Sequence, residues 1–324
     1  MKRFLFYLEG VLYYDADRTR RVEDSNPTYH VVARVKIPAH LTDVAFVEQT
    51  LEESMRGLIF IGYDSKSRKQ YFYGKLHVEQ RNHSRDEIFL RVHKVKHEID
   101  AFVERHLRFA RKITVENQLA VFLLLETSFY IRTGKVRYYK NNETVGLLTL
   151  QNQHIAVDPR EIRIAFRGKD RVDHCFRIDR ADRLYGPVKA LYDKKRPDAF
   201  VFGLLNEARV YAFMKRYGVR IKDLRTYGVN VTFLFNIWYN VNTLETLPSV
   251  KKLISVSLNQ TADVIGHTAN ISKRAYVTLT VLRVLTTQVI EEVIRDRPFE
   301  TFLEFVISYI EHGRQDRPAD QHQV

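Results

Sequence analysis

A histidine, two basic residues and a tyrosine lie close together in the segment 266–276, which reads GHTANISKRAY. His267 precedes Tyr276 by nine positions, and Lys273 and Arg274 lie between them. A hydroxyl nucleophile beside an imidazole and fixed positive charge suits covalent attack on a phosphodiester. Tyr276 also begins an apolar run of helix length, residues 276–285, so we expect it at the start of a helix.

Three further basic residues stand where local structure would fix their positions. Arg132 follows an apolar run, Lys169 occupies a predicted hairpin tip, and Arg225 closes the motif Lys-Asp-Leu-Arg. Attack on a phosphodiester builds negative charge on the non-bridging oxygens, which arginine forks stabilise. A lysine on a hairpin can deliver the proton that the leaving 5′-oxygen needs. With positive charge supplied in this way, the reaction needs no metal.

Each of these residues also has an ordinary explanation. Tyrosines at the start of apolar helices usually pack in a core, and hairpin-tip lysines are usually simple turn residues. Arg132 could decorate a helix C-terminus, where positive charge is favourable. Arg225 could form a surface ion pair with Asp223. The pair His93 and His97 has the spacing of two metal ligands but lacks an obvious third, so we expect exposed histidines there.

The elements that position these residues differ between the two ends of the chain. The first eighty residues indicate strands at 3–8, 11–14, 30–37, 58–63 and 71–77, with a turn at Glu9-Gly10. One helix is expected between them, with Thr42 as its cap, apolar residues at helical spacing to Met55, and Gly57 at its end. This pattern predicts a small antiparallel β-rich domain.

A polar stretch near residues 79–87 ends that pattern, and the chain beyond it is mainly helical. Helices are expected at 88–107, 118–131, 199–217 and 230–241, interrupted by a hairpin over 162–178 whose turn is Arg167-Gly168-Lys169-Asp170. We therefore predict an α+β protein. Its parts are an N-terminal domain (1–79), a linker (80–87), a larger helical catalytic domain with a short β-hairpin (88–312) and a polar tail (313–324).

Composition narrows the class of partner. Of 324 residues, 45% are hydrophobic, and the net charge is +13, which favours nucleic acid first and an anionic membrane second. The longest uninterrupted apolar run, 119–125, is too short to span a membrane, and Glu9 ends the apolar N-terminal stretch too early for a signal peptide. The single cysteine, Cys175, permits neither a disulfide nor a CxxC metal pair. A soluble, non-secreted protein without cofactor or metal is expected.

Several long motifs in this chain resemble the type IB DNA topoisomerases, specifically the poxvirus enzymes. The motifs are GYDSK at 62–66, KQYFYGK at 69–75, ETVGLLTL at 143–150, IKDLRTYG at 221–228 and the segment 266–276. The resemblance runs from the first strands to about residue 310, and the tail after Gly313 has no clear counterpart.

The resemblance implies roles for individual residues. Tyr276 would be the nucleophile that forms a 3′-phosphotyrosyl bond, and Lys169 would be the general acid for the 5′-oxygen. Arg132, Arg225 and His267 would bind the scissile phosphate. Lys222 would assist proton transfer, and Asp170 would help to orient the site. The implied DNA contacts are Gln70, Tyr71, Tyr73, Lys135, Arg137 and Tyr138, the last three in a segment that those enzymes lay in the major groove.

The implied activity is relaxation of supercoiled duplex DNA by reversible cleavage of one strand. No ATP is needed, and the chain has no GxxxxGK[ST] loop. The resemblance further implies a monomer that clamps the duplex, a preference for a short pyrimidine motif, and a place in the virion and host cytoplasm. Two alternatives remain: a tyrosine recombinase, although those usually carry histidine where this chain has Lys222, or a non-enzymatic basic DNA-binding protein.

Overall fold

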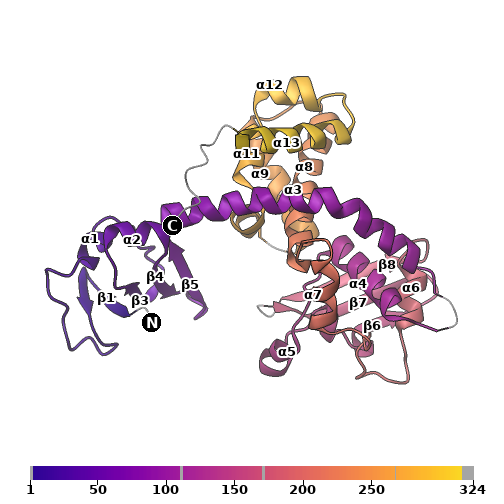
Figure 1. The fold of residues 1–324 in the computed structure, drawn as a ribbon, viewed down its shortest axis with the longest axis horizontal. Coiled ribbons are helices and arrows are strands. Elements are labelled where there is room, and N and C mark those ends of the chain that lie inside the picture. Colours follow the sequence, from indigo (N-terminus) through magenta and orange to yellow (C-terminus); the bar gives the residue numbers. More distant parts are fainter. Residues whose placement is uncertain (1–2, 110–111, 170–171, 267, 316–324) are drawn as a thin grey trace. The chain divides into compact units, whose positions relative to one another are not determined.

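The computed structural model describes residues 3–109, 112–169, 172–266 and 268–315 (Figure 1). The chain forms two compact units, Met1–Ser84 and Arg85–Val324. The long helix α3 (Lys75–His106) contributes residues to both units, and residues 80–87 are part of it. An antiparallel sheet followed by a mainly helical region with a second small sheet confirms the predicted α+β class.

The first unit is a five-stranded antiparallel sheet in the order β2-β1-β3-β4-β5 with two short helices. Its elements are β1 (Phe4–Leu8), β2 (Val11–Tyr13), α1 (Thr28–Val32), β3 (Thr42–Val47), α2 (Leu51–Arg56), β4 (Leu58–Tyr63) and β5 (Lys69–Tyr73). Glu9 and Gly10 both have positive φ, 46° and 90°, as a tight hairpin turn between β1 and β2 requires. The predicted turn is confirmed. One face of the sheet is apolar, and Phe60 stacks there on Phe72 at 4.2 Å.

Three predictions for this unit are wrong. The strand expected at 71–77 is β5, which ends at Tyr73, and residues 75–77 belong to α3. The β-branched run at 30–37 is not a strand, because the chain forms α1 there and buries Val31 in the core. The expected helix start at Thr42 is strand β3, whose residues from Val44 to Val47 are all buried. A short continuous apolar run fits a buried strand as well as a helix. The helix begins at Leu51 instead, where Thr50 and Glu53 form a capping box.

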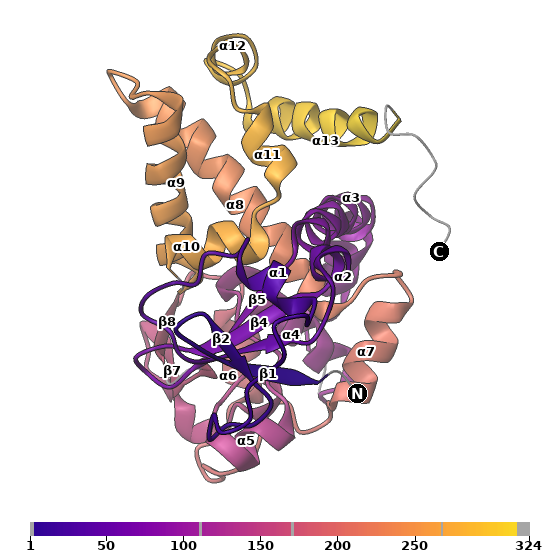
Figure 2. The ribbon, with the colours of Figure 1, turned by 90° about the vertical axis from the view of Figure 1, so that its left-hand side faces the viewer.

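The second unit is mainly helical (Figures 1 and 2). Its α-helices after α3 are α4 (Val115–Phe129), α5 (Val136–Asn142), α6 (Tyr185–Leu191), α7 (Glu207–Lys215), α8 (Ile221–Thr243), α9 (Val250–Ile265), α10 (Ala269–Ile271), α11 (Leu279–Val284), α12 (Thr287–Val289) and α13 (Phe299–Gln315). The described residues also form the 3₁₀ turns η1 (Leu147–Thr149) and η2 (Asn152–His154) and the π-helical turns η4 (Ser272–Tyr276) and η5 (Ile290–Ile294). Helix α4 is buried along residues 117–126, as its apolar run predicts.

A three-stranded antiparallel sheet interrupts these helices. It consists of β6 (Ile155–Val157), β7 (Glu161–Arg167) and β8 (Asp173–Asp179), with β7 in the centre. Strands β7 and β8 pair without a break from Glu161–Asp179 to Arg167–Asp173, which confirms the predicted hairpin. Cys175 lies on the exposed face of β8.

The helix predictions for this unit are right in type and less accurate in extent. The expected helix at 199–217 is shorter, because Asn206 caps α7 and the residues before it form turns. The expected helix at 230–241 is longer, because α8 already begins at Ile221. Helix α13 continues to Gln315, and residues 316–324 of the predicted tail lie outside the described residues.

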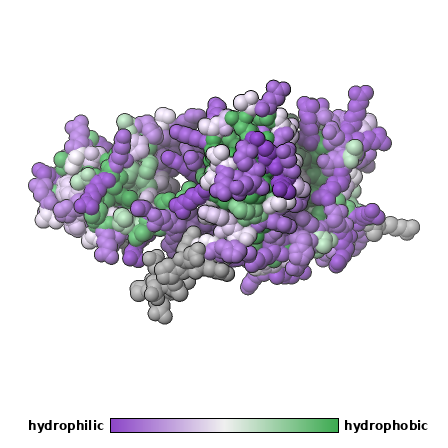
Figure 3. Space-filling model, turned by 90° about the horizontal axis from the view of Figure 1, so that it is seen from above, coloured by the Kyte–Doolittle hydropathy of each residue, from purple (hydrophilic) through white to green (hydrophobic). Residues whose placement is uncertain are grey.

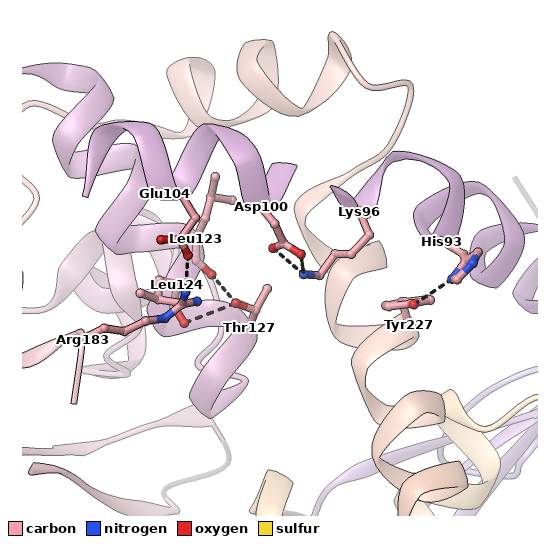
Figure 4. Close-up of polar contacts among 9 residues, drawn as sticks. All are labelled: His93, Lys96, Asp100, Glu104, Leu123, Leu124, Thr127, Arg183 and Tyr227. Carbon is pink, nitrogen blue, oxygen red and sulfur yellow. Dashed lines mark hydrogen bonds and ion pairs between the residues drawn. The ribbon is translucent and has the colours of Figure 1, made fainter. Parts of the chain in front are cut away.

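Polar contacts join α3 to its neighbours within the second unit (Figure 4). The Nδ1 atom of His93 lies 3.0 Å from the hydroxyl of Tyr227 on α8. Burial lowers the pKa of His93. The expectation of an exposed histidine is therefore wrong for His93, whereas His97 is exposed.

Among the described residues, no helix is long and apolar enough to cross a membrane. Within the same residues, no three histidine, cysteine or acidic side chains converge as a metal site would require. Hydrophilic residues predominate on the face drawn in Figure 3, with hydrophobic side chains visible in the gaps between them.

Candidate active site

Arg225 is the buried cation of the site. It lies on α8 with 7% of its surface exposed, and its guanidinium donates a hydrogen bond to the carbonyl of Tyr130. Its Cζ atom lies 5.7 Å from the ring centroid of Tyr276. Burial lowers the pKa of Arg225, with a further lowering from the charge of Arg132, while Tyr276 and Glu126 oppose the shift. The guanidinium is thus held between the end of α4 and the tyrosine.

The acidic neighbour of Arg225 in sequence has a different partner. Asp223 is buried and pairs with Arg220 at 3.0 Å, where its carboxylate also accepts from the backbone N–H of Arg220. An N-terminal carboxylate of this kind stabilises the first turn of a helix. A surface ion pair between Arg225 and Asp223 is therefore wrong as an explanation of Arg225. Lys222 lies one turn before Arg225 on α8, with its side chain exposed.

Tyr276 ends a helical turn rather than beginning a helix. The π-helical turn η4 stops at Tyr276, and Val277 and Thr278 continue in an extended conformation. Helix α11 begins only after Thr278, whose hydroxyl accepts from the backbone N–H of Val281 at 3.1 Å. The predicted position at a helix start is wrong because a threonine N-cap interrupts the apolar run. Tyr276 itself is half-buried.

A residue that the sequence did not suggest holds this break in the helix. Asn230 on α8 is fully buried, and its amide donates to the carbonyl of Tyr276 at 3.1 Å. Its side-chain oxygen accepts from the N–H of Thr278 at 2.9 Å. A buried amide needs such partners. An asparagine on the buried side of an apolar helix was the available signal, but it does not reveal a partner 46 residues away.

Arg132 lies in an irregular segment that other backbone groups hold in place. Tyr130 ends α4 in the left-handed conformation, with φ of 52°. The carbonyl of Arg132 accepts from the N–H of Leu147 at 2.9 Å. Gly134 has φ of 69° and packs so closely on Gly146 that a Cβ would lie 2.6 Å from its Cα. Glycine is required at such a backbone contact, and the half-buried Arg132 is placed by it.

Lys169 lies in the turn between β7 and β8 and is exposed. Asp170 and His267 are outside the described residues. Gly168, which precedes Lys169, and Gly266 both lie near the ring of His174 on β8, because a Cβ added at Gly168 would lie 2.7 Å from that ring and one added at Gly266 would lie 3.4 Å from it. Burial lowers the pKa of His174, and the positive charges of Arg132 and Arg225 lower it further. The hairpin turn and the end of α9 therefore lie near the two arginines.

A buried carboxyl group lies near Arg225. Glu126 on α4 is 3% exposed, and burial raises its pKa to about 8 against the opposing effect of Arg225 and Lys96. A carboxyl group with this pKa is mostly neutral at pH 7.

The proposed DNA contacts of the first unit lie on β5. Tyr71 is 53% exposed, and Phe72 points into the core, as strand alternation predicts. Tyr73 stacks on His77 at 4.5 Å. Gln70 donates to the carboxylate of Asp64 at 3.0 Å. Their contact with DNA stays a prediction.

The proposed DNA contacts of the second unit lie at α5. Lys135 is the residue before this helix, and its ammonium is 3.0 Å from the carboxylate of Glu207 and 5.6 Å from the ring centroid of Tyr211. Arg137 is exposed in the first turn. Tyr138 follows it, but its side chain is outside the described part of the structure.

Comparison with known proteins gives the same family along most of the chain. Residues 5–62 match the family model "Viral DNA topoisomerase I, N-terminal", and residues 75–293 match "Eukaryotic DNA topoisomerase I, catalytic core". The chain is 50% identical to the DNA topoisomerase 1B of Vaccinia virus (strain Copenhagen) over 95% of this chain and 98% of the relative. The DNA topoisomerase 1 of Rabbit fibroma virus shows the same identity and coverage. The DNA topoisomerase 1B of Acanthamoeba polyphaga mimivirus is 26% identical over 67% of this chain and 69% of the relative.

Proposed function

The chain belongs to the poxvirus-type family of type IB DNA topoisomerases and is a type I topoisomerase that acts on DNA, and on this premise we propose that Tyr276 is its nucleophile. The tyrosine hydroxyl attacks a phosphorus of one DNA strand, and the bond from phosphorus to the 5′-oxygen breaks. The product is a 3′-phosphotyrosine and a free 5′-hydroxyl. The uncut strand permits swivelling, and the 5′-hydroxyl then reverses the attack.

Fixed positive charge stabilises the transition state in this proposal. Arg225 and Arg132 donate to the non-bridging oxygens, and His267 donates a further bond. The observation that carries the proposal is the position of the buried Arg225 guanidinium over the Tyr276 ring. A phosphate bound to that guanidinium would lie within reach of the tyrosine hydroxyl. The covalent bond conserves the energy of the phosphodiester, so no ATP is consumed and no metal is required.

The leaving 5′-oxygen receives its proton from Lys169, assisted by Lys222. The exposed position of Lys169 in a hairpin turn supports this role, since such a side chain can follow the DNA end. Asp170 orients the turn. In the reverse reaction, Lys169 takes the proton back from the 5′-hydroxyl, as microscopic reversibility requires.

The nucleophile is tested by replacing Tyr276 with phenylalanine. We expect duplex binding to persist and the denaturant-resistant DNA adduct to disappear, and an adduct that survives would refute the assignment. Relaxation of supercoiled plasmid by the wild-type protein should proceed in EDTA and without ATP. A strict metal requirement would contradict the mechanism.

The finer features of DNA recognition are also proposals. Residues 1–79 and 88–312 act as a DNA-clamping domain and a catalytic domain of one monomer, which sedimentation of the free and DNA-bound protein would check. The exposed Tyr71 supports a DNA-facing β5. A preference for a short pyrimidine motif would emerge when adducts are mapped on a random-sequence duplex. We further propose the virion and host cytoplasm as the site of action, testable by fractionation of infected cells.

A tyrosine recombinase would share this chemistry but assemble tetramers on two duplexes. Lys222, where recombinases usually carry histidine, favours the topoisomerase. Exchange of strands between two labelled duplexes would favour the recombinase, and a monomer that relaxes plasmid would exclude it.

A further inference from the structure

Arg85 on α3 contacts the backbone on both sides of Tyr276. It is 7% exposed and lies in the second unit. Its guanidinium donates to the carbonyl of Arg274 and, at 3.4 Å, to the carbonyl of Val277. In the sequence these two carbonyls lie on either side of Tyr276. Arg85 precedes Arg274 by 189 positions and Val277 by 192 positions.

The turn that ends at Tyr276 needs such a partner. The last carbonyls of a helical turn have no hydrogen-bond donors within the turn, and positive charge is favourable there. In η4 the N–H of Val277 donates to the carbonyl of Ser272, and the Arg85 guanidinium donates to the carbonyls of Arg274 and Val277. An arginine fork can serve two of them at once in one fixed geometry.

The carbonyls at this point are shared between two helices. The side-chain amide of Asn230 on α8 donates to the carbonyl of Tyr276, while the guanidinium of Arg85 on α3 donates to the carbonyls of Arg274 and Val277. The next residue of α3 adds a further link, because the carboxylate of Asp86 accepts from the hydroxyl of Thr280 on α11 at 2.6 Å. Helix α3 therefore holds the backbone both before and after the extended link between Tyr276 and α11.

We propose that Arg85 is a positioning residue, which caps the turn ending at Tyr276 and thereby sets the direction of the tyrosine hydroxyl for attack. The inference rests on the proposed role of Tyr276 as nucleophile. Arg85 acts through the backbone and not on the phosphate. Covalent attack depends steeply on alignment, and a misplacement of about 1 Å can cost roughly 100-fold in rate.

The test compares Arg85→Ala and Arg85→Lys with Arg105→Ala, which removes the same charge from an exposed position of the same helix. The rate of adduct formation is measured in a single turnover at saturating concentrations of a suicide duplex, and duplex affinity is measured separately with Tyr276→Phe present in each variant. We expect Arg85→Ala to form the adduct about 10- to 100-fold more slowly, with duplex affinity changed by less than the rate. Arg85→Lys, with fewer donors, should lie between it and the wild type, and Arg105→Ala should match the wild type.

Two further readouts separate positioning from other roles. Guanidinium ion added to Arg85→Ala should partly restore the rate by refilling the cap. A duplex with a 5′-bridging sulfur, whose leaving group needs no proton, should not restore it. Full rescue by that sulfur would place the defect in the leaving-group step and overturn the proposal.

The remaining outcomes distinguish this proposal from the one on which it rests. A wild-type rate in Arg85→Ala, or a loss explained entirely by weaker binding, would overturn the positioning role while Tyr276→Phe stays inactive. An adduct in Tyr276→Phe would instead overturn the nucleophile assignment. Should Arg85→Ala fail to fold, the rate of Arg85→Lys decides, since a rate equal to that of the wild type contradicts the need for a two-pronged cap.

Discussion

Replacing Glu126 by glutamine should stabilise the protein, and the gain should grow as the pH rises. Burial raises the pKa of this carboxyl from the usual 4.5 to about 8, so the folded state holds a proton that the unfolded chain releases. Because the folded pKa lies above the unfolded one, stability is lost as the pH rises from about 4.5 and levels off above about 8. Glutamine has nearly the same shape and cannot ionise, so it escapes this loss.

The size of this stability gain follows from the difference between the pKa of Glu126 in the folded state and in the unfolded chain. Each unit of pKa difference corresponds to about 1.4 kcal/mol. The gain in unfolding free energy should therefore be about 1 kcal/mol at pH 5, about 3 kcal/mol at pH 7 and about 5 kcal/mol at pH 9.

Urea unfolding followed by tryptophan fluorescence measures this difference in the second unit, because Trp238 is the chain's single tryptophan and lies on α8. Glu104→Gln is the matched control. Glu104 is exposed and pairs with Arg183, so its replacement should change stability by less than about 1 kcal/mol. The reasoning about Glu126 is refuted if the difference between variant and wild type is equal at pH 5 and pH 9.

Three other changes test the site from different sides. Lys169→Ala should slow cleavage by roughly 10²–10⁴-fold, and a 5′-bridging sulfur should restore the rate; no rescue would mean that Lys169 is not the general acid. Glu207→Gln frees Lys135 from its ion pair and should tighten duplex binding by about two- to fivefold. The effect should exceed that of Glu300→Gln, which removes the same negative charge at an exposed position, and equal effects would contradict this. Because the pKa of His174 lies below its usual 6.5, the wild type should lose stability as the pH falls below about 6.5. In urea unfolding across that range, His174→Asn should lose less stability than the wild type, and parallel losses would count against a half-buried His174 that is neutral in the folded protein.

Local patterns predicted the parts of this fold that depend on neighbours in sequence. Alternation located the hairpin that carries Lys169, and the apolar run before Arg132 located a buried helix. Both signals are contained within a few turns of chain, so they survive without knowledge of tertiary contacts. The capping threonine is a weaker signal, because Thr278 lies inside a mostly apolar segment of helix length that favours a helix start at Tyr276.

The supports of the site could not be predicted in the same way. Asn230, Arg85 and His174 act on backbone or loops that are distant in sequence, and nothing in their own segments indicates the partner. The approach of Gly266 to the hairpin is of the same kind, because it exists only after β8 and the end of α9 have come together. The type of a residue indicates which chemistry its side chain can perform, whereas the geometry that makes this chemistry effective depends on long-range packing.

The exposed thiol on β8 gives this protein a built-in attachment point for a spectroscopic probe. Cys175 is the chain's single cysteine, and it lies on the strand that leads away from the turn containing Lys169. A fluorophore or spin label would therefore couple to one defined position without removal of other thiols. Its signal would track the hairpin during DNA binding, cleavage and resealing, in an otherwise unaltered enzyme.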